Sequence, residues 1–388
     1  MNAKPSAAAP DARRYAISLL VVFAALHAAM FAYDRLHPDR FLNADRAQER
    51  IGAIQGFIGA WNNGGVAPFL ASHGIPGDWL PQALAYMAGG QSLVIAIQIA
   101  LALLSILAVQ RLGHAVGLGS RAAAGGAALY GLLPHTLVFP HQLAAEAIFD
   151  PLVVLSFSWA LGARSGLALG AATLVRPVTL AWPVIHAGAS PGPRRAKAAY
   201  LLWALAPLLL WMCFILLATG ELSMWRSSHD LGHNLYARIQ RMSASLPQAE
   251  RPAPRPAGHT SVGVAEYLRF VARHPVAAAG HSVRDVVALT AKSGIERLTL
   301  DYLDLFPRAR SAIQDSDAGW RVQLEKHGLK AAALQLYAEQ PGLVLVSGLA
   351  AVFFLAFMFL ALAGAWGGHA RRTPQGPQTI REGHCASS

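Results

Sequence analysis

The sequence predicts an all-α polytopic membrane protein. Hydrophobic residues make up 54% of its 388 residues, above the ~45–50% that is typical of soluble domains, and the mean hydropathy is +0.37. Uncharged stretches of the ~20 residues needed to cross a ~30 Å hydrocarbon core recur at 15–33, 91–110, 122–145, 198–220 and 341–370. The formal net charge is +11, but the basic residues are spread over short loops. Lipid headgroups and membrane topology explain such a pattern better than nucleic acid does.

The first apolar stretch is predicted to be an uncleaved membrane helix. Arg13 and Arg14 precede it, as basic residues precede a signal peptide, which is the alternative. The stretch is longer than the apolar region of a usual signal peptide, and further spans follow it. The two cysteines, Cys213 in an apolar span and Cys385 in the tail, indicate no disulfide framework.

Basic residues in short loops orient the chain, because Lys and Arg concentrate on the cytoplasmic side. With the N-terminus inside, the spans 15–33, 91–110, 122–139 and 147–163 return the chain to the cytoplasm at Arg164. The basic loops placed inside by this arrangement contain Arg13, Arg14, Arg111, Arg121, Arg164, Arg194, Arg195, Lys197, Arg371 and Arg372. Acidic residues are nearly absent from these loops.

Residues 166–188 are predicted to form a short broken hairpin. A single span here would place the cluster at 194–197 outside and invert every later assignment. A break at Arg176–Pro177 restores the charge rule, since proline disrupts a helix. Arg176 would then lie near the outer tip. An arginine at membrane depth is a candidate functional residue by default, although it could also snorkel to lipid headgroups.

The whole chain is therefore expected to make about eight crossings. Residues 1–220 form the membrane core, residues 221–340 a mostly helical outer segment with a Pro-rich linker at 247–259, and residues 341–388 the last crossing, at 341–365, and a cytoplasmic tail. Residues 281–303 have helical periodicity and could lie along the membrane or pack as an ordinary helix.

The first outer loop, 34–78, concentrates charge in the stretch HPDRFLNADRAQER at 37–50. The residues that follow predict a helix with Ile51, Ile54, Phe57 and Ile58 on one side. Asp45 has two interpretations: it is an N-cap of this helix, a role that Asn43 could also fill, or it faces a cavity at the membrane surface beside arginines that bind phosphate.

Two further groups of residues could bind a ligand. Glu146 and Asp150 are four residues apart, so they share one face of a helix, and with His141 they could hold an acceptor or a metal. Two carboxylates at the end of a span are also common as solvated interfacial residues. The His229, Asp230 and His233 group has ligand spacing only if it is helical, which Gly232 disfavours, so no metal is assigned, while His229 could contact a phosphate or a sugar.

The ordered series of these features resembles the GT-C glycosyltransferases of the protein mannosyltransferase and aminoarabinose transferase type. The charged first outer loop is followed by PGDWLPQALAYMAGGQSLVIAIQIALALLSILAVQRLG, then LAAEAIFDPLVVLSF, then GLALGAATLVRPVTLAWP. The resemblance covers about residues 15–220. It implies a GT-C-like helical core and transfer of a sugar from a polyprenyl-phosphate donor to a hydroxyl acceptor, with inversion, at the outer face of a bacterial cytoplasmic membrane.

The resemblance also implies roles for particular residues. Asp45 would be the general base, with Asp39 as its substitute because Arg46 stands where the family often has a second acidic residue. Arg176, Arg46 and Arg40 would bind the donor phosphate, and Glu146, His141 and His229 would contact sugar or acceptor. No cofactor beyond the lipid-linked sugar is indicated, and a metal requirement stays undefined. The acceptor could be a glycan, a lipid or a protein.

Two functions of other classes would use the same architecture. A transporter or flippase of lipid-linked glycans would need the cavity but no base, and internal repeats, expected of many transporters, are not found. A non-catalytic membrane subunit would use Asp45 only as a helix cap.

Overall fold

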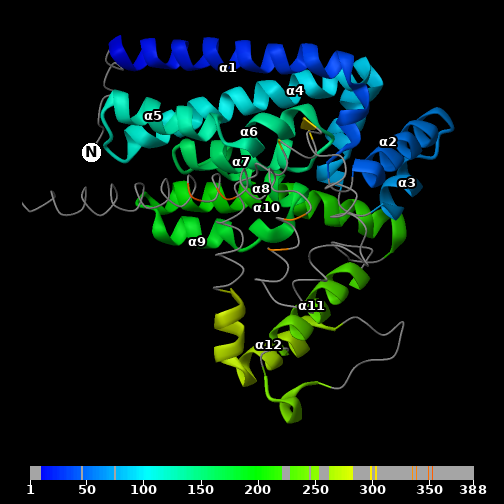
Figure 1. Ribbon diagram of the computed structural model, residues 1–388. Coiled ribbons are helices and arrows are strands. Elements are labelled where there is room, and N and C mark those ends of the chain that lie inside the picture. Colours follow the sequence, from blue (N-terminus) through cyan, green and yellow to red (C-terminus); the bar gives the residue numbers. More distant parts are fainter. Residues whose placement is uncertain are drawn as a thin grey trace, which may run out of the picture.

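The computed structural model describes residues 10–44, 47–73, 76–220, 228–243, 246–252 and 262–282, together with the single positions 298, 302, 303, 334, 338, 348 and 352. Every regular element in these ranges is a helix. The all-α prediction is thereby confirmed for the part of the chain that is described. Figure 1 shows the longer helices lying side by side as a bundle.

Three helices are long and apolar enough to cross a membrane, namely α1 (Pro10–Leu36), α4 (Leu80–Ala115) and α10 (Arg194–Thr219). They contain the predicted spans 15–33 and 91–110 and nearly all of 198–220. The pair formed by α5 (Ser120–Gly131) with α6 (Pro134–Val138) and η3 (Phe139–His141) is bent by 66° and counts as a fourth span if taken as one. These helices are consistent with a membrane protein.

In the described ranges, fewer helices are long enough to cross a membrane than the eight crossings predicted. The helices α7 (Glu146–Ser158) and α8 (Ala163–Val175) have 13 residues each, which corresponds to about 20 Å, whereas the hydrocarbon core is ~30 Å thick. The final predicted span, 341–365, lies outside the residues described apart from two single positions.

The helix break predicted at Arg176–Pro177 is confirmed. The helix α8 ends at Val175, Arg176 has an extended backbone (φ −141°, ψ 111°), and the chain continues through η4 (Pro177–Thr179) into α9 (Trp182–Ala189). Ala187 of α9 is buried in one cluster with Leu169 of α8 and Tyr200 of α10. The segment after the break therefore packs mainly against α10, in a cluster that also includes α8.

Close contact between α8 and α10 depends on two glycines, Gly166 and Gly170. A Cβ atom at Gly166 would lie 2.2 Å from the carbonyl oxygen of Tyr200, and one at Gly170 would lie 2.4 Å from that of Ala204. Small residues spaced by four let membrane helices approach closely. This spacing fixes the register of α8, and hence the position of Arg176 at its end.

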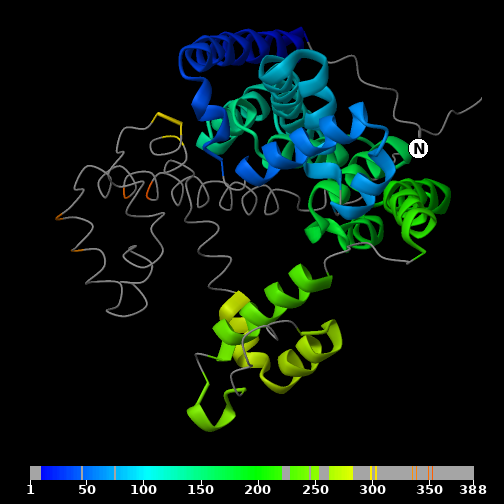
Figure 2. The ribbon, with the colours of Figure 1, turned by 90° about the vertical axis from the view of Figure 1, so that its right-hand side faces the viewer.

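The loop 34–78, predicted to be the first outer loop, is folded against the bundle. It contains η1 (Pro38–Leu42), α2 (Ala47–Asn62), α3 (Val66–Ser72) and η2 (Pro76–Asp78). Ile54 and Phe57 are buried in a cluster with Trp79 and Val94, and Ile51 and Ile58 pack against it, so the predicted apolar side of this helix is confirmed. Figure 2 shows α2 and α3, in blue, lying against the other helices of the bundle.

The described part of the outer segment contains α11 (Ser228–Ser243), η5 (Gln248–Glu250) and α12 (Val264–Arg273). Both views show α11 and α12 apart from the bundle (Figures 1 and 2). Ile239, Met242 and Val262 form a buried cluster with side chains of α12 around it. This pair of helices thus has a small apolar core of its own.

Candidate functional site

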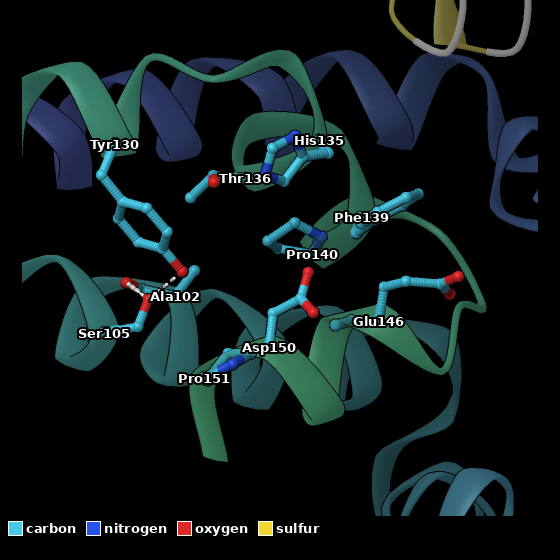
Figure 3. A pocket seen from close by; sticks show the side chains of 11 residues that line it. Ala102, Ser105, Tyr130, His135, Thr136, Phe139, Pro140, Glu146, Asp150 and Pro151 are labelled. Carbon is cyan, nitrogen blue, oxygen red and sulfur yellow. Dashed lines mark hydrogen bonds between the residues drawn. The ribbon is translucent and has the colours of Figure 1, made fainter. Parts of the chain in front are cut away.

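A polar pocket lies between α4, α5, α6 and α7. It is small and partly open to solvent. Figure 3 shows the side chains of Glu146 and Asp150 beside it. The lining is completed by Ala102, Ser105, Tyr130, His135, Thr136, Phe139, Pro140, Ala147 and Pro151. Hydroxyls, an imidazole and two carboxylates therefore meet beside an aromatic ring and prolines.

The two carboxylates are placed by the start of α7. Glu146 is its first residue and Asp150 follows one turn later on the same face, as the spacing predicts. A carboxylate in the first turn of a helix is favoured by the helix dipole. The pocket wall opposite comes from α5, where the Tyr130 hydroxyl lies 3.3 Å from the Ser105 hydroxyl, to which it donates (Figure 3).

Arg176, at the end of α8, pairs with the pocket residue Glu146. Its guanidinium donates a hydrogen bond to Glu146 Oε1 and forms an ion pair with it. The guanidinium carbon also lies 6.0 Å from the centre of the Phe149 ring. Because 42% of the Arg176 side chain and 27% of the Glu146 side chain are exposed, both charges are accessible to a ligand.

The end of the first outer loop packs against the last residues of α8, just before the break at Arg176–Pro177. At Gly77 in η2, a Cβ atom would lie 2.3 Å from the carbonyl carbon of Leu174 and 2.6 Å from the backbone nitrogen of Val175. Only glycine permits this approach without a shift of the backbone. The end of the first outer loop thus lies directly against the residues that lead to Arg176.

The segment from η3 to α7 is held by hydrogen bonds from three other parts of the chain. The backbone nitrogen of Leu143 donates to the carbonyl of Phe41 (2.8 Å), and its own carbonyl accepts from Arg50 (3.3 Å). The Gln82 amide donates to the carbonyl of Ala144 (3.0 Å). These bonds position the residues immediately before Glu146.

A buried network anchors the same segment to α1. His141 Nδ1 lies 2.5 Å from Asp34 Oδ2, and His141 Nε2 lies 2.9 Å from His27 Nδ1. An ionised carboxylate only accepts hydrogen bonds, so His141 donates from Nδ1, and in its neutral form Nε2 accepts from His27. His27 Nε2 is then an acceptor, and it has no hydrogen-bond partner among the described residues.

Tyr302, from the outer segment, completes this network. Its hydroxyl donates to Asp34 Oδ1 (2.8 Å) and lies 3.2 Å from the carbonyl of Met30. Its own carbonyl accepts a hydrogen bond from Arg40, whose guanidinium carbon lies 4.8 Å from the centre of the Tyr33 ring. Arg40, predicted to bind phosphate, is engaged here in holding Tyr302.

The predicted site residues are therefore only partly brought together. Arg176 and Glu146 meet, whereas His141 is fully buried in the network with Asp34 and is not among the pocket residues. Asp39 is exposed in η1. Asp45, Arg46 and the side chain of His229 lie outside the described residues, and the backbone at 229 is helical despite Gly232.

Sequence reasoning missed His27 and Asp34. Their positions in the sequence could have identified them, because an ionisable residue within a membrane span is unusual and normally has a partner. His27 interrupts the apolar run at 15–33, and Asp34 follows directly after it. The identity of the partner, more than 100 residues away, has no local signal.

Within the described ranges, no group of three or more His, Cys, Asp and Glu side chains is arranged to hold a metal ion. Comparison with known proteins gives no match to a family model, to a curated protein or to a solved structure.

Proposed function

We propose that this chain is an integral membrane glycosyltransferase that transfers a sugar from a polyprenyl-phosphate donor to a hydroxyl acceptor, with inversion. One observation supports this function above the others. Arg176, which is accessible, pairs with Glu146, and Glu146 and Asp150 both line the pocket described above. Transfer from a lipid phosphate needs a cation for the departing phosphate, and the sugar or the acceptor needs hydrogen-bonding partners.

Arg176 would bind the donor phosphate in this mechanism. The planar guanidinium binds phosphate with two parallel hydrogen bonds and concentrates positive charge where the leaving group develops negative charge. Asp45 would remove the proton of the acceptor hydroxyl, with Asp39 as the substitute. The donor lipid would lie among the membrane helices, and its sugar would face the extracytoplasmic side, reached by the first outer loop.

The chemistry of the pocket lining suits a sugar. The hydroxyls of Ser105, Tyr130 and Thr136 and the carboxylate of Asp150 supply hydrogen-bond donors and acceptors. Phe139 adds an aromatic side chain to the lining. Polar groups arranged around an apolar surface are what fixes the orientation of a small ligand.

Lipids that co-purify with the full chain test this function. Mass spectrometry should find a polyprenyl-phosphate-linked sugar in preparations of the wild-type protein. Arg176→Ala should reduce the amount by about tenfold or more, because a hydrogen bond to a charged group contributes ~1.5–3 kcal/mol. Arg164→Ala is the matched control, since Arg164 is exposed at the other end of α8.

Two results would contradict the proposal. The wild-type protein could carry no polyprenyl-phosphate lipid, or both variants could carry as much of it as the wild type does. If the protein retains the lipid but transfers no sugar, the result would instead support a transporter of lipid-linked glycans.

A further inference from the structure

The structure points to a second role for Glu146. We infer that its carboxylate occupies Arg176 in place of the donor phosphate and is released when a phosphate binds. This inference rests on the proposed function, because it requires Arg176 to receive the phosphate of a polyprenyl lipid. It adds that the phosphate site is closed by the chain itself until the donor arrives.

Glu146 and a bound phosphate would compete for the same atoms of Arg176. Glu146 Oε1 accepts its hydrogen bond from a terminal nitrogen of Arg176. Carboxylate and phosphate both bind the guanidinium fork through pairs of oxygens, so they cannot occupy one edge of it together. A phosphate that binds there has to displace Glu146.

Glu146 can be displaced because it has other stabilising surroundings. It stands at the first position of α7, where the helix dipole favours a negative charge. It also lines the pocket and is partly exposed, so the released carboxylate remains hydrated. The Arg176 side chain is more exposed than that of Glu146, which leaves it open to an incoming anion.

Release of Glu146 would change the pocket. The carboxylate would be free to accept a hydrogen bond from a hydroxyl group, next to Asp150 one turn away on α7. Binding of the donor phosphate would in this way prepare the pocket for a hydroxyl-bearing ligand. The consequence is an order of binding, with donor before acceptor.

Affinity for undecaprenyl phosphate, a polyprenyl phosphate without a sugar, tests the inference in the full chain. Glu146→Gln should bind this probe about threefold to tenfold more tightly than the wild type, because the glutamine amide competes for Arg176 far less than a carboxylate does. Asp150→Asn is the matched control. It alters the second carboxyl group on the same helix face without removing the ion-pair partner of Arg176, so it should change the affinity less.

A double variant shows whether the gain comes through Arg176. In the Arg176→Ala background, Glu146→Gln should no longer increase the affinity, since the two residues are then uncoupled. Melting temperatures of all variants in the same detergent show that the chain remains folded.

The outcomes separate this inference from the proposed function. If Arg176→Ala weakens binding while Glu146→Gln leaves it unchanged or weaker, the displacement is refuted and the phosphate site stands. Equal gains from Glu146→Gln and Asp150→Asn also refute it, because general charge then accounts for both. If the wild-type protein does not bind undecaprenyl phosphate, the proposed function fails and this inference fails with it.

Discussion

The side chain of Asp34 has both carboxylate oxygens engaged, one with the His141 ring and one with the Tyr302 hydroxyl. It is almost completely buried. A carboxylate in this position acts as a structural anchor and is closed to a substrate. Its effect on the pocket is indirect, through His141, which directly follows the pocket residue Pro140.

Asp34→Asn should lower the stability of the folded protein. The carboxamide has one oxygen that accepts and one nitrogen that does not, so either His141 or Tyr302 loses its hydrogen bond to this side chain. Leaving a buried polar group unsatisfied costs about 1–3 kcal/mol. Thermal unfolding in detergent would show this as a lower melting temperature than that of Asp11→Asn, a control at an exposed position of the same helix. Equal melting temperatures would show that Asp34 is not an anchor.

Asp45→Asn tests the proposed base. Asparagine caps a helix about as well as aspartate but cannot accept a proton at neutral pH, and a general base typically contributes ~100 to 10,000-fold to the rate. The variant should insert into the membrane, bind the polyprenyl-phosphate sugar and transfer almost none of it. If transfer proceeds at the wild-type rate, Asp39→Asn becomes the test, and activity in both variants would overturn the mechanism.

At the scale of elements, the packing of α8 against α10 determines where Arg176 lies. Gly170 approaches the backbone of Ala204 so closely that even a methyl group requires the helices to separate. Gly170→Ala should therefore reduce the melting temperature and the yield of folded protein. Gly188→Ala on α9 is the control, because its Cβ would meet nothing within 4 Å, and alanine is the better helix former. Equal behaviour of the two variants would contradict this packing.

Sequence patterns predicted those features of the fold that are determined by neighbouring residues in the chain. The charge pattern and Pro177 located the helix break, and the apolar spacing of Ile54 and Phe57 located the buried side of α2. Helix length was less predictable. The apolar run at 122–145 was expected to contain one crossing, but the chain there divides into α5, α6 and η3. Pro134 starts α6 and Pro140 lies in η3, and proline disrupts a continuous helix.

Much of the candidate site could not be predicted in the same way. The pairing of Arg176 with Glu146 joins residues 30 positions apart, and that of His141 with Asp34 joins residues 107 apart. Neither pairing leaves a periodic pattern in the sequence. The sequence identified Glu146 and Arg176 as candidates, and only the packing of α7 beside α8 shows that they are partners.

At the scale of the whole molecule, the predicted topology places Ser190 on the cytoplasmic side and Ser72 on the outer side. In a background without Cys213 and Cys385, a cysteine at Ser72 should react with an impermeant thiol reagent in intact cells, and one at Ser190 should react only after the cells are opened. Ser72 is exposed and Ser190 is half-buried, so permeabilised cells provide the reference for full labelling. Labelling of both sites in intact cells would refute the hairpin.

The hydrogen bonds that hold residues 141–144 imply an order of assembly. The groups that receive this segment, in His27, Asp34, Phe41, Arg50 and Gln82, all precede it in the chain. During synthesis, which proceeds from the N-terminus, the segment therefore emerges after the groups that bind it. Arg176 emerges 30 residues after Glu146, and Tyr302 later still. The segment that positions Glu146 can thus be bound before Arg176, the partner of Glu146, emerges.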